Sequence, residues 1–202
     1  MRALLVPVKS FRVAKARLSS VLDADERASL ARALGAQVLA AAGDVPVSVA
    51  CDDGEVADWA SALGAQVLFT PHLGLSGAVG AAVEHLGRSG ATLVVVSHAD
   101  LPYAHDLGDF GRDGVVTLAP DHRLDGTNVI AVPARSGFRF AYGRGSYARH
   151  RTEAARLGLL ALTRYDPRLA TDIDVPADLE RIAPLLTALA LDARSRPTAM
   201  CP

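Results

Sequence analysis

The sequence predicts an α/β fold in which helices cover both faces of a mostly parallel sheet. Short apolar runs alternate with helix-like segments along most of the chain, and such alternation is typical of βαβ units. Thr92–Ser97 (TLVVVS) is rich in β-branched residues, which suits a strand buried on both faces of a parallel sheet. The 202 residues, half of them hydrophobic, suit a single domain with a sizeable core.

Seven short apolar runs predict the strands of this sheet. In chain order they are Arg2–Val8, Pro46–Ala50, Gln66–Thr70, Thr92–Ser97, Gly114–Ala119, Asn128–Val132 and Leu159–Thr163. In folds of this class, ligands bind at the carboxyl ends of the strands. We therefore expect the functional residues to lie directly after these runs.

Five segments predict helices. The first begins at Asp23, because Glu26 three residues later completes a capping-box pattern, and it stops at Gly43. The other four are Glu55–Leu63, residues 75–87, Ser146–Leu157 and Pro176–Leu191. We expect one domain over residues 1–191 and a flexible C-terminal tail over residues 192–202. The apolar last helix is suited to forming a homodimer.

The formal net charge of −1 argues against a nucleic-acid-binding protein with a large basic face. The charge is unevenly distributed, however. Residues 1–22 hold five basic side chains and no acidic one, and residues 135–168 hold eight arginines and two acidic side chains. These segments indicate either one binding site for an anionic small molecule or two solvated basic surfaces.

The chain shows no apolar run long enough for a membrane span and no signal-peptide pattern, so we expect a cytoplasmic protein without a membrane partner. Its two cysteines, Cys51 and Cys201, cannot form a disulfide framework or a zinc site. No Ser/His/Asp or Cys/His arrangement has convincing spacing for nucleophilic catalysis.

The loop after the first strand carries the only two lysines of the chain, Lys9 and Lys15. Arginine serves as the basic residue everywhere else, so a compact ammonium in this loop indicates point-charge contact with a phosphate. Retention of both lysines by chance is the alternative. The loop is not a Walker A motif, because it lacks the glycines.

Three aspartates follow predicted strands or lie in an extended segment. Asp100 comes shortly after Thr92–Ser97, where its carboxylate needs a cation unless it caps the following segment. Asp172 and Asp174 share one face of an extended segment and repel each other unless a cation lies between them. Together, the three carboxylates suffice to hold one or two Mg²⁺ ions against a triphosphate.

Three glycine-containing loops are candidate substrate loops. Asp125–Asn128 leads into a predicted strand and contains the only asparagine of the chain. Tyr142–Ser146 leads into a helix whose start offers backbone N–H groups to an anion, although simple serine capping explains Ser146 equally well. Leu73–Ala78 opens another helix, and its glycines allow close approach of a base or ribose.

Five motifs, in this order, resemble a known family: PVKSFRVAKARL, ADLP, DGTN, GRGSYARH and TDIDVPADL. The family comprises the 2-phospho-L-lactate and phosphoenolpyruvate guanylyltransferases of deazaflavin coenzyme F-420 biosynthesis, and the resemblance runs from about Arg2 to about Leu186. It implies a three-layer, Rossmann-like nucleotide-diphospho-sugar transferase (GT-A-type) fold. It also implies a reaction of GTP with a phosphorylated small carboxylic acid, with phosphoenolpyruvate favoured, that releases pyrophosphate.

The resemblance also implies roles for individual residues. Lys9 and Lys15 lie along the triphosphate with help from Arg17, and Asp100, Asp172 and Asp174 hold Mg²⁺. The acceptor's phosphate or carboxylate is received by Thr127, Gly143 and Ser146. The nucleotide is contacted by Gly74, Leu75 and Ser76, although the family usually has Asn where this chain has Ser76.

Three other functions fit parts of the sequence. A glycosyltransferase of the same fold uses an Asp-x-Asp metal pair such as Asp172 and Asp174. A nucleotidyltransferase of the molybdopterin type normally has a glycine-rich first loop, which is absent here. A non-enzymatic nucleotide-binding module predicts a broken metal site, whereas all three aspartates are present.

Overall fold

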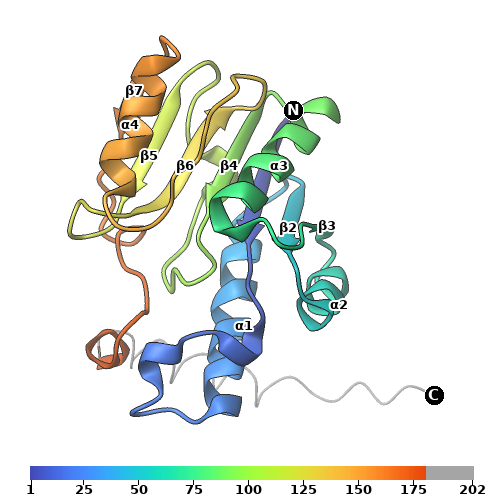
Figure 1. The fold of residues 1–202 in the computed structure, drawn as a ribbon, viewed down its shortest axis with the longest axis vertical. Coiled ribbons are helices and arrows are strands. Elements are labelled where there is room, and N and C mark those ends of the chain that lie inside the picture. Colours follow the sequence, from blue (N-terminus) through green and yellow to red (C-terminus); the bar gives the residue numbers. More distant parts are fainter. Residues whose placement is uncertain (181–202) are drawn as a thin grey trace.

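A computed structural model describes residues 1–180, which form one mixed seven-stranded sheet between two layers of helices (Figure 1). The strand order is β3-β2-β1-β4-β6-β5-β7. The strands are β1 Arg2–Pro7, β2 Val47–Cys51, β3 Gln66–Phe69, β4 Leu93–Ser97, β5 Val116–Pro120, β6 Thr127–Pro133 and β7 Ala161–Thr163. All seven predicted strands are therefore confirmed, with ends shifted by one or two residues.

The first four predicted helices are also confirmed. They are α1 Ala24–Ala40, α2 Gly54–Ala62, α3 Gly74–Arg88 and α4 Ser146–Arg156. The fifth starts at Pro176 as expected, but residues 181–202 lie outside the described part of the chain. The predicted domain end at residue 191, the tail over 192–202 and the dimer-forming helix therefore stay predictions. The sequence did not predict three short 3-10 helices, η1 Phe11–Val13, η2 Ala16–Leu18 and η3 Leu107–Asp109.

The described sheet is mostly parallel, as predicted, and β6 alone runs against the other strands. It pairs antiparallel with both β4 and β5, whereas the remaining pairs are parallel. The link from β5 to β6 spans only residues 121–126, and a link this short joins antiparallel neighbours. As a result, the first residues of β6 lie beside the carboxyl end of β4.

Alternate residues of the central strands fill two cores, one on each face of the sheet. Leu4 and Val6 of β1 pack in the core that includes residues of α1 and α2. Ala3 and Leu5 pack in the opposite core, which includes residues of α3 and α4. Because both faces of the central strands are covered, their sequences are continuously apolar rather than alternating.

The start of α1 shows the capping box that the sequence predicts. The Asp23 carboxylate accepts the Glu26 backbone N–H at 2.8 Å, and the Glu26 carboxylate accepts the Asp23 backbone N–H at 2.8 Å. Close to this helix, the buried Phe11 ring meets the edge of Trp59 with centroids 5.3 Å apart. Phe11 therefore anchors the loop after β1, which carries both lysines.

Among residues 1–180, no helix combines the length and apolar character needed to cross a membrane.

Candidate active site

A cleft of about 320 Å³ lies at the carboxyl ends of the adjacent strands β1 and β4. Its lining comes from the end of β1 and the loop after it, from α1, from the loop after β4, from the start of α3 and from the segment before residue 176. The polar side chains in this lining are Lys9, Lys15, His98, Asp100 and Asp174. The fold thus brings together, at one edge of the sheet, motifs that lie up to 165 residues apart.

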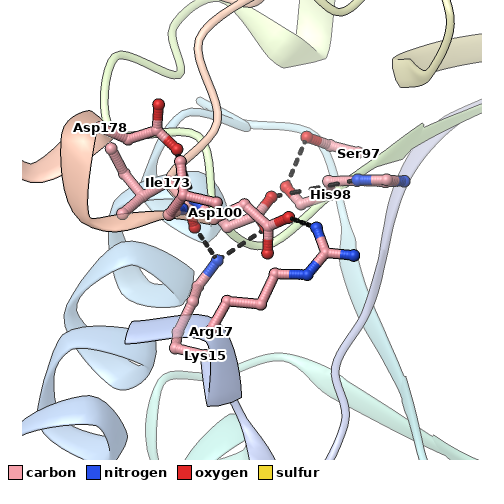
Figure 2. Close-up of polar contacts among 9 residues, drawn as sticks. Lys15, Arg17, Ser97, His98, Asp100, Ile173 and Asp178 are labelled. Atoms are coloured by element: carbon pink, nitrogen blue, oxygen red, sulfur yellow. Dashed lines mark hydrogen bonds and ion pairs between the residues drawn. The ribbon is translucent and has the colours of Figure 1, made fainter. Parts of the chain in front are cut away.

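Lys15 is the central cation of this cleft. It lies between η1 and η2 with φ of 54°, in the left-handed region that residues other than glycine rarely adopt. Its side chain is only 9% exposed, and its Nζ donates to Asp100 Oδ2 at 2.7 Å and to the carbonyl of Ile173 (Figure 2). The surrounding contacts hold a strained backbone in place, so this loop positions one ammonium group closely.

Asp100 is the carboxylate that receives Lys15. Burial disfavours its charged form, but the Lys15 ammonium, aided by His98, holds the pKa of Asp100 below its usual value. The other carboxylate oxygen, Oδ1, is buried without a hydrogen-bond partner in the described structure. An ionised carboxylate with one free buried oxygen is suited to binding a cation in the cleft.

The segment that carries Asp172 and Asp174 is tied to the loop after β4, because the Ile173 backbone N–H donates to the Asp100 carbonyl at 3.2 Å. Burial and the nearby Asp100 carboxylate raise the pKa of Asp172 above its usual value. Asp100 and Asp172 are therefore close enough to repel each other. A divalent cation near both carboxylates would relieve that repulsion.

Asp174 has a different partner. Its carboxylate pairs with the Arg17 guanidinium, and both side chains are well exposed. The structure thus places Asp172 close to Asp100, whereas Asp174 lines the same cleft as Asp100 and pairs with Arg17. Consistent with this, residues 1–180 contain no group of three or more His, Cys, Asp or Glu side chains arranged to hold a metal ion.

Asp178 lies in the first turn of the helix that begins at Pro176, and its side chain binds the backbone just before that helix. Its carboxylate accepts the backbone N–H groups of Asp174 and Val175, each at 2.9 Å. This contact fixes the end of the extended segment next to the cleft.

Lys9 is exposed and lines the same cleft as Lys15. It also borders a smaller pocket of about 60 Å³, whose lining includes Asp52, Thr70, Gly74 and Leu75. Both lysines therefore face one continuous region at the carboxyl ends of β1, β2 and β4.

Comparison with known proteins places this arrangement in a family. The family described as "Guanylyl transferase CofC like" matches residues 1–184. The chain belongs to this family. Similar proteins include the phosphoenolpyruvate guanylyltransferase of Sphaerobacter thermophilus, 34% identical over 188 residues that cover 89% of this chain and 91% of the relative. The 2-phospho-L-lactate guanylyltransferase of Halorubrum lacusprofundi is 37% identical over 188 residues, covering 88% and 82%.

Solved structures confirm the predicted fold of this CofC-like chain. A putative nucleotide-diphospho-sugar transferase from Desulfovibrio desulfuricans superimposes with a TM-score of 0.72 at 18% identity, covering 90% of this chain and 85% of that one. A nucleotidyl transferase from Methanothermobacter superimposes with a TM-score of 0.65 at 14% identity, covering 94% and 99%. At these identities the likeness concerns the fold alone.

The residues predicted to receive the acceptor lie together, between β6 and the start of α4. Thr127 and Ser146 are each 1% exposed, and their hydroxyl oxygens are 3.4 Å apart. Thr127 Oγ1 also lies 3.0 Å from His150 Nδ1, and His150 Nε2 accepts the Ala141 backbone N–H at 3.0 Å. Gly143, in contrast, is exposed with φ of 97°. The helix cap at this point is Gly145, so Ser146 is not the cap that one interpretation of the sequence predicts.

The residues predicted to contact the nucleotide open α3. Gly74 has φ of 62°, and Leu75 lines both the cleft and the smaller pocket. Ser76 Oγ accepts the Tyr142 backbone N–H at 3.0 Å, so this hydroxyl connects α3 to the loop before α4. Whether Gly74, Leu75 and Ser76 bind the nucleotide stays a prediction.

The sequence carried little signal for His98, which lines the cleft, or for Tyr142, whose ring packs against His98. His98 lines the cleft beside Asp100, and its Nδ1 lies 4.0 Å from Asp100 Oδ1. The Tyr142 ring lies 5.4 Å from the His98 ring, between centroids. A histidine beside an aspartate and a tyrosine in a glycine-rich loop are both common on protein surfaces. Only the tertiary contact distinguishes these two.

Proposed function

We propose that this chain transfers the guanylyl group of GTP to the phosphate of a small phosphorylated carboxylic acid, phosphoenolpyruvate or 2-phospho-L-lactate. A phosphate oxygen of the acid attacks the α-phosphorus of GTP, the bond between the α-phosphorus and its bridging oxygen breaks, and pyrophosphate leaves. The product is a guanosine diphospho-linked acid of the kind used in coenzyme F-420 biosynthesis. The convergence of Lys15, Asp100 and Asp172 at the carboxyl edge of the sheet carries this proposal.

The chemistry requires charge neutralisation more than a general base. The acceptor phosphate is already an anionic nucleophile, and the triphosphate that it approaches is also anionic. Lys15 and Lys9 line the cleft and supply positive charge beside both anions and the leaving pyrophosphate. Arg17 belongs to the same basic loop and pairs with Asp174, which lines the cleft, so it is positioned to assist the two lysines along the triphosphate.

Asp100 and Asp172 are the residues that fit a Mg²⁺ ion. Asp100 offers a buried, unpartnered Oδ1, and Asp172 offers a partly buried carboxylate that Asp100 repels. Oxygen donors of this kind are the usual ligands of Mg²⁺ in phosphate-binding sites. When bound, the ion supplies positive charge to the phosphate oxygens. Asp174 also lines the cleft, and its Oδ1 can serve as a further ligand because the ion pair with Arg17 uses Oδ2.

Phosphoenolpyruvate is the favoured acceptor. Its support comes from the relatives in Sphaerobacter thermophilus and Roseiflexus castenholzii, both named phosphoenolpyruvate guanylyltransferase and 34% and 35% identical to this chain. The relative in Halorubrum lacusprofundi is named for 2-phospho-L-lactate. The two acids differ only in that phosphoenolpyruvate has a CH₂=C unit where 2-phospho-L-lactate has a CH₃–CH unit. One or two contacts with the protein therefore decide between them.

A pyrophosphate-release assay tests the proposal. The protein is mixed with GTP and Mg²⁺, together with phosphoenolpyruvate, 2-phospho-L-lactate or 3-phosphoglycerate, and a parallel reaction supplies a sugar nucleotide in place of GTP. We expect pyrophosphate with one of the first two acids and no sugar transfer. Absence of pyrophosphate with every acid, or sugar transfer instead, would refute the proposal.

Asp172→Asn tests the carboxylate pair in the same assay. We expect turnover to fall by about 100-fold or more, because a charge that faces the phosphates is lost. The matched control is Asp58→Asn on the exposed side of α2, which should keep wild-type turnover. Wild-type turnover of Asp172→Asn at saturating Mg²⁺ would contradict the assignment.

A further inference from the structure

Asn128 lies at a β-bulge near the start of β6. Val129 of this strand pairs with Ala119 of β5, and Thr127 pairs with Pro120, so the register shifts by one residue at Asn128. A bulge redirects the side chain of the extra residue, and bulges are frequent next to active sites. Asn128 is 3% exposed, whereas the next four residues of the strand are all apolar. A buried amide in such a strand indicates a specific polar contact.

The Asn128 amide holds a distant part of the chain. Its Nδ2 donates to the Leu169 carbonyl at 2.9 Å, and this hydrogen bond is buried. Leu169 itself is fully buried in the core that includes residues of α1 and α2. It belongs to residues 164–174, an irregular segment after β7 that also carries Asp172 and Asp174. Asn128 therefore ties the segment of these two aspartates to the central sheet.

The backbone of Asn128 holds the loop that carries the other carboxylate. Its carbonyl accepts the His98 backbone N–H at 2.9 Å, and Asp100 lies two residues beyond His98. The loop and the segment also touch directly, because the Ile173 backbone N–H donates to the Asp100 carbonyl at 3.2 Å. One residue of β6 thus contacts both of the chain segments that bring Asp100 and Asp172 together.

The position of Asp172 has to be maintained against electrostatic repulsion. Asp100 contributes to raising the pKa of Asp172, which shows that the two carboxylates repel each other. The hydrogen bond from Asn128 is made three residues before Asp172, where it opposes outward movement of the irregular segment. Groups that orient the ligands of a metal ion without touching the ion are typically needed for full metal affinity.

Other contacts hold the same segment independently of the Asn128 side chain. Asp166 Oδ2, six residues before Asp172, lies 3.2 Å from His105 Nε2 of the loop after β4. The Ala170 carbonyl accepts the His122 backbone N–H at 3.1 Å. These contacts remain when Asn128 is replaced, so we expect a folded variant in which the segment shifts locally.

We propose that Asn128 is a positioning residue that sets the Mg²⁺ affinity of the site by holding residues 164–174 against the loop of Asp100. The inference rests on the proposed function, in which Asp100 and Asp172 bind the ion. Asn128 acts through the Leu169 carbonyl rather than through the ion. Without the amide, this buried carbonyl loses its donor, and the segment moves until the carbonyl meets water or another donor. The movement carries Asp172 away from Asp100 and weakens the site.

Asn128→Leu tests this inference, because leucine has nearly the shape of asparagine but cannot donate a hydrogen bond. Mn²⁺ is the probe, and the electron paramagnetic resonance signal of free Mn²⁺ measures its binding to the protein without GTP or acid. We expect the Kd for Mn²⁺ to rise about tenfold, the lower end of what loss of a ligand-orienting group typically costs. An unchanged Kd in the folded variant would overturn the inference.

Ser136→Ala is the matched control. Ser136 Oγ donates to the Pro133 carbonyl at 2.7 Å, so this change removes the same kind of hydrogen bond at the opposite end of β6. It should leave the Kd for Mn²⁺ within about twofold of wild type, and an equal rise in this control would count against the inference. If thermal unfolding shows that Asn128→Leu does not fold, Asn128→Ser replaces it, because the serine hydroxyl is too short to reach Leu169. Wild-type Mn²⁺ affinity in Asn128→Ser would then reject the inference.

The Mg²⁺ dependence of turnover separates a positioning role from a structural one. With GTP and phosphoenolpyruvate saturating, Asn128→Leu should need about tenfold more Mg²⁺ for half-maximal rate. At saturating Mg²⁺ its kcat should return to within about threefold of wild type. A merely structural defect would lower the rate by one factor at every Mg²⁺ concentration, and that result would refute the inference. Failure of the proposed function is distinguishable, since it appears as absent pyrophosphate release by wild type while the Mn²⁺ titration still reports on the carboxylates.

Discussion

Replacing Lys15 by Met removes the cation of the buried ion pair while keeping a side chain of similar length. Lys15 is 9% exposed and Asp100 is 26% exposed, so the pair is mostly shielded from water. Removing one partner of a fully buried pair costs about 3–5 kcal/mol. Because Asp100 is partly exposed, we expect Lys15→Met to lower the free energy of unfolding by about 2–3 kcal/mol at pH 7.

The pH dependence of this loss identifies its cause. In wild type, Lys15 holds the pKa of Asp100 below the unfolded value of about 3.9, so the pair contributes stability above that pH and loses it as the pH falls further. Without Lys15, burial and Asp172 push the pKa of Asp100 upward. The variant is then destabilised most at pH 7, and the difference from wild type shrinks as the pH approaches 4.

Urea denaturation at pH 7.5, 6.0 and 4.5 measures both the size and the pH dependence of the loss. Lys9→Met is the matched control, because Lys9 is the other lysine of the same loop and its side chain is exposed. It should change the free energy of unfolding by no more than about 0.5 kcal/mol. If Lys15→Met lost no more than this control, or if its loss were the same at every pH, the reasoning would fail.

Two other perturbations have definite expected outcomes. Burial lowers the pKa of His150 to about 4, against about 6.5 in the unfolded chain, so the unfolded state binds the extra proton first. Between pH 7 and pH 4, the free energy of unfolding of wild type should therefore fall by about 3 kcal/mol more than that of His150→Gln. Urea denaturation at both pH values measures this, and an equal fall in the two proteins would contradict it. A Cβ added at Gly108 would lie 2.3 Å from the Ala42 carbonyl oxygen, so Gly108→Ala should cost about 2–3 kcal/mol. Gly80→Ala in α3 is the control, because no atom lies within 4 Å of the added Cβ, and it should not lower the Tm. A lower Tm for Gly80→Ala than for Gly108→Ala would be inconsistent with this packing.

Local patterns predicted most of the elements. The valines of β4 and the capping box at Asp23 depend on burial and on contacts within one turn, so neighbouring residues alone specify them. The reversed direction of β6 was less apparent, since strand-like sequences look alike in both directions. The direction depends instead on the length of the link between β5 and β6.

The site shows the same division. The position of Lys15 and Asp100 directly after strands predicted that both lie at one edge of the sheet, and their contact at 2.7 Å confirms it. The spacing of Asp172 and Asp174 predicted a shared face, yet Arg17 holds Asp174 while Asp172 approaches Asp100. Spacing along the chain does not reveal which cation lies nearest to each carboxylate.

Residue order was thus sufficient for the fold class, the strand and helix segments, and the group of side chains that carries charge into the cleft. These follow from burial and from hydrogen bonds between residues close in the chain. The three-dimensional arrangement decided which charges neutralise one another and which polar atoms, such as the Tyr142 hydroxyl, stay without a partner. Both properties depend on distances of a few ångströms between distant segments, because electrostatic and hydrogen-bond energies fall steeply with separation.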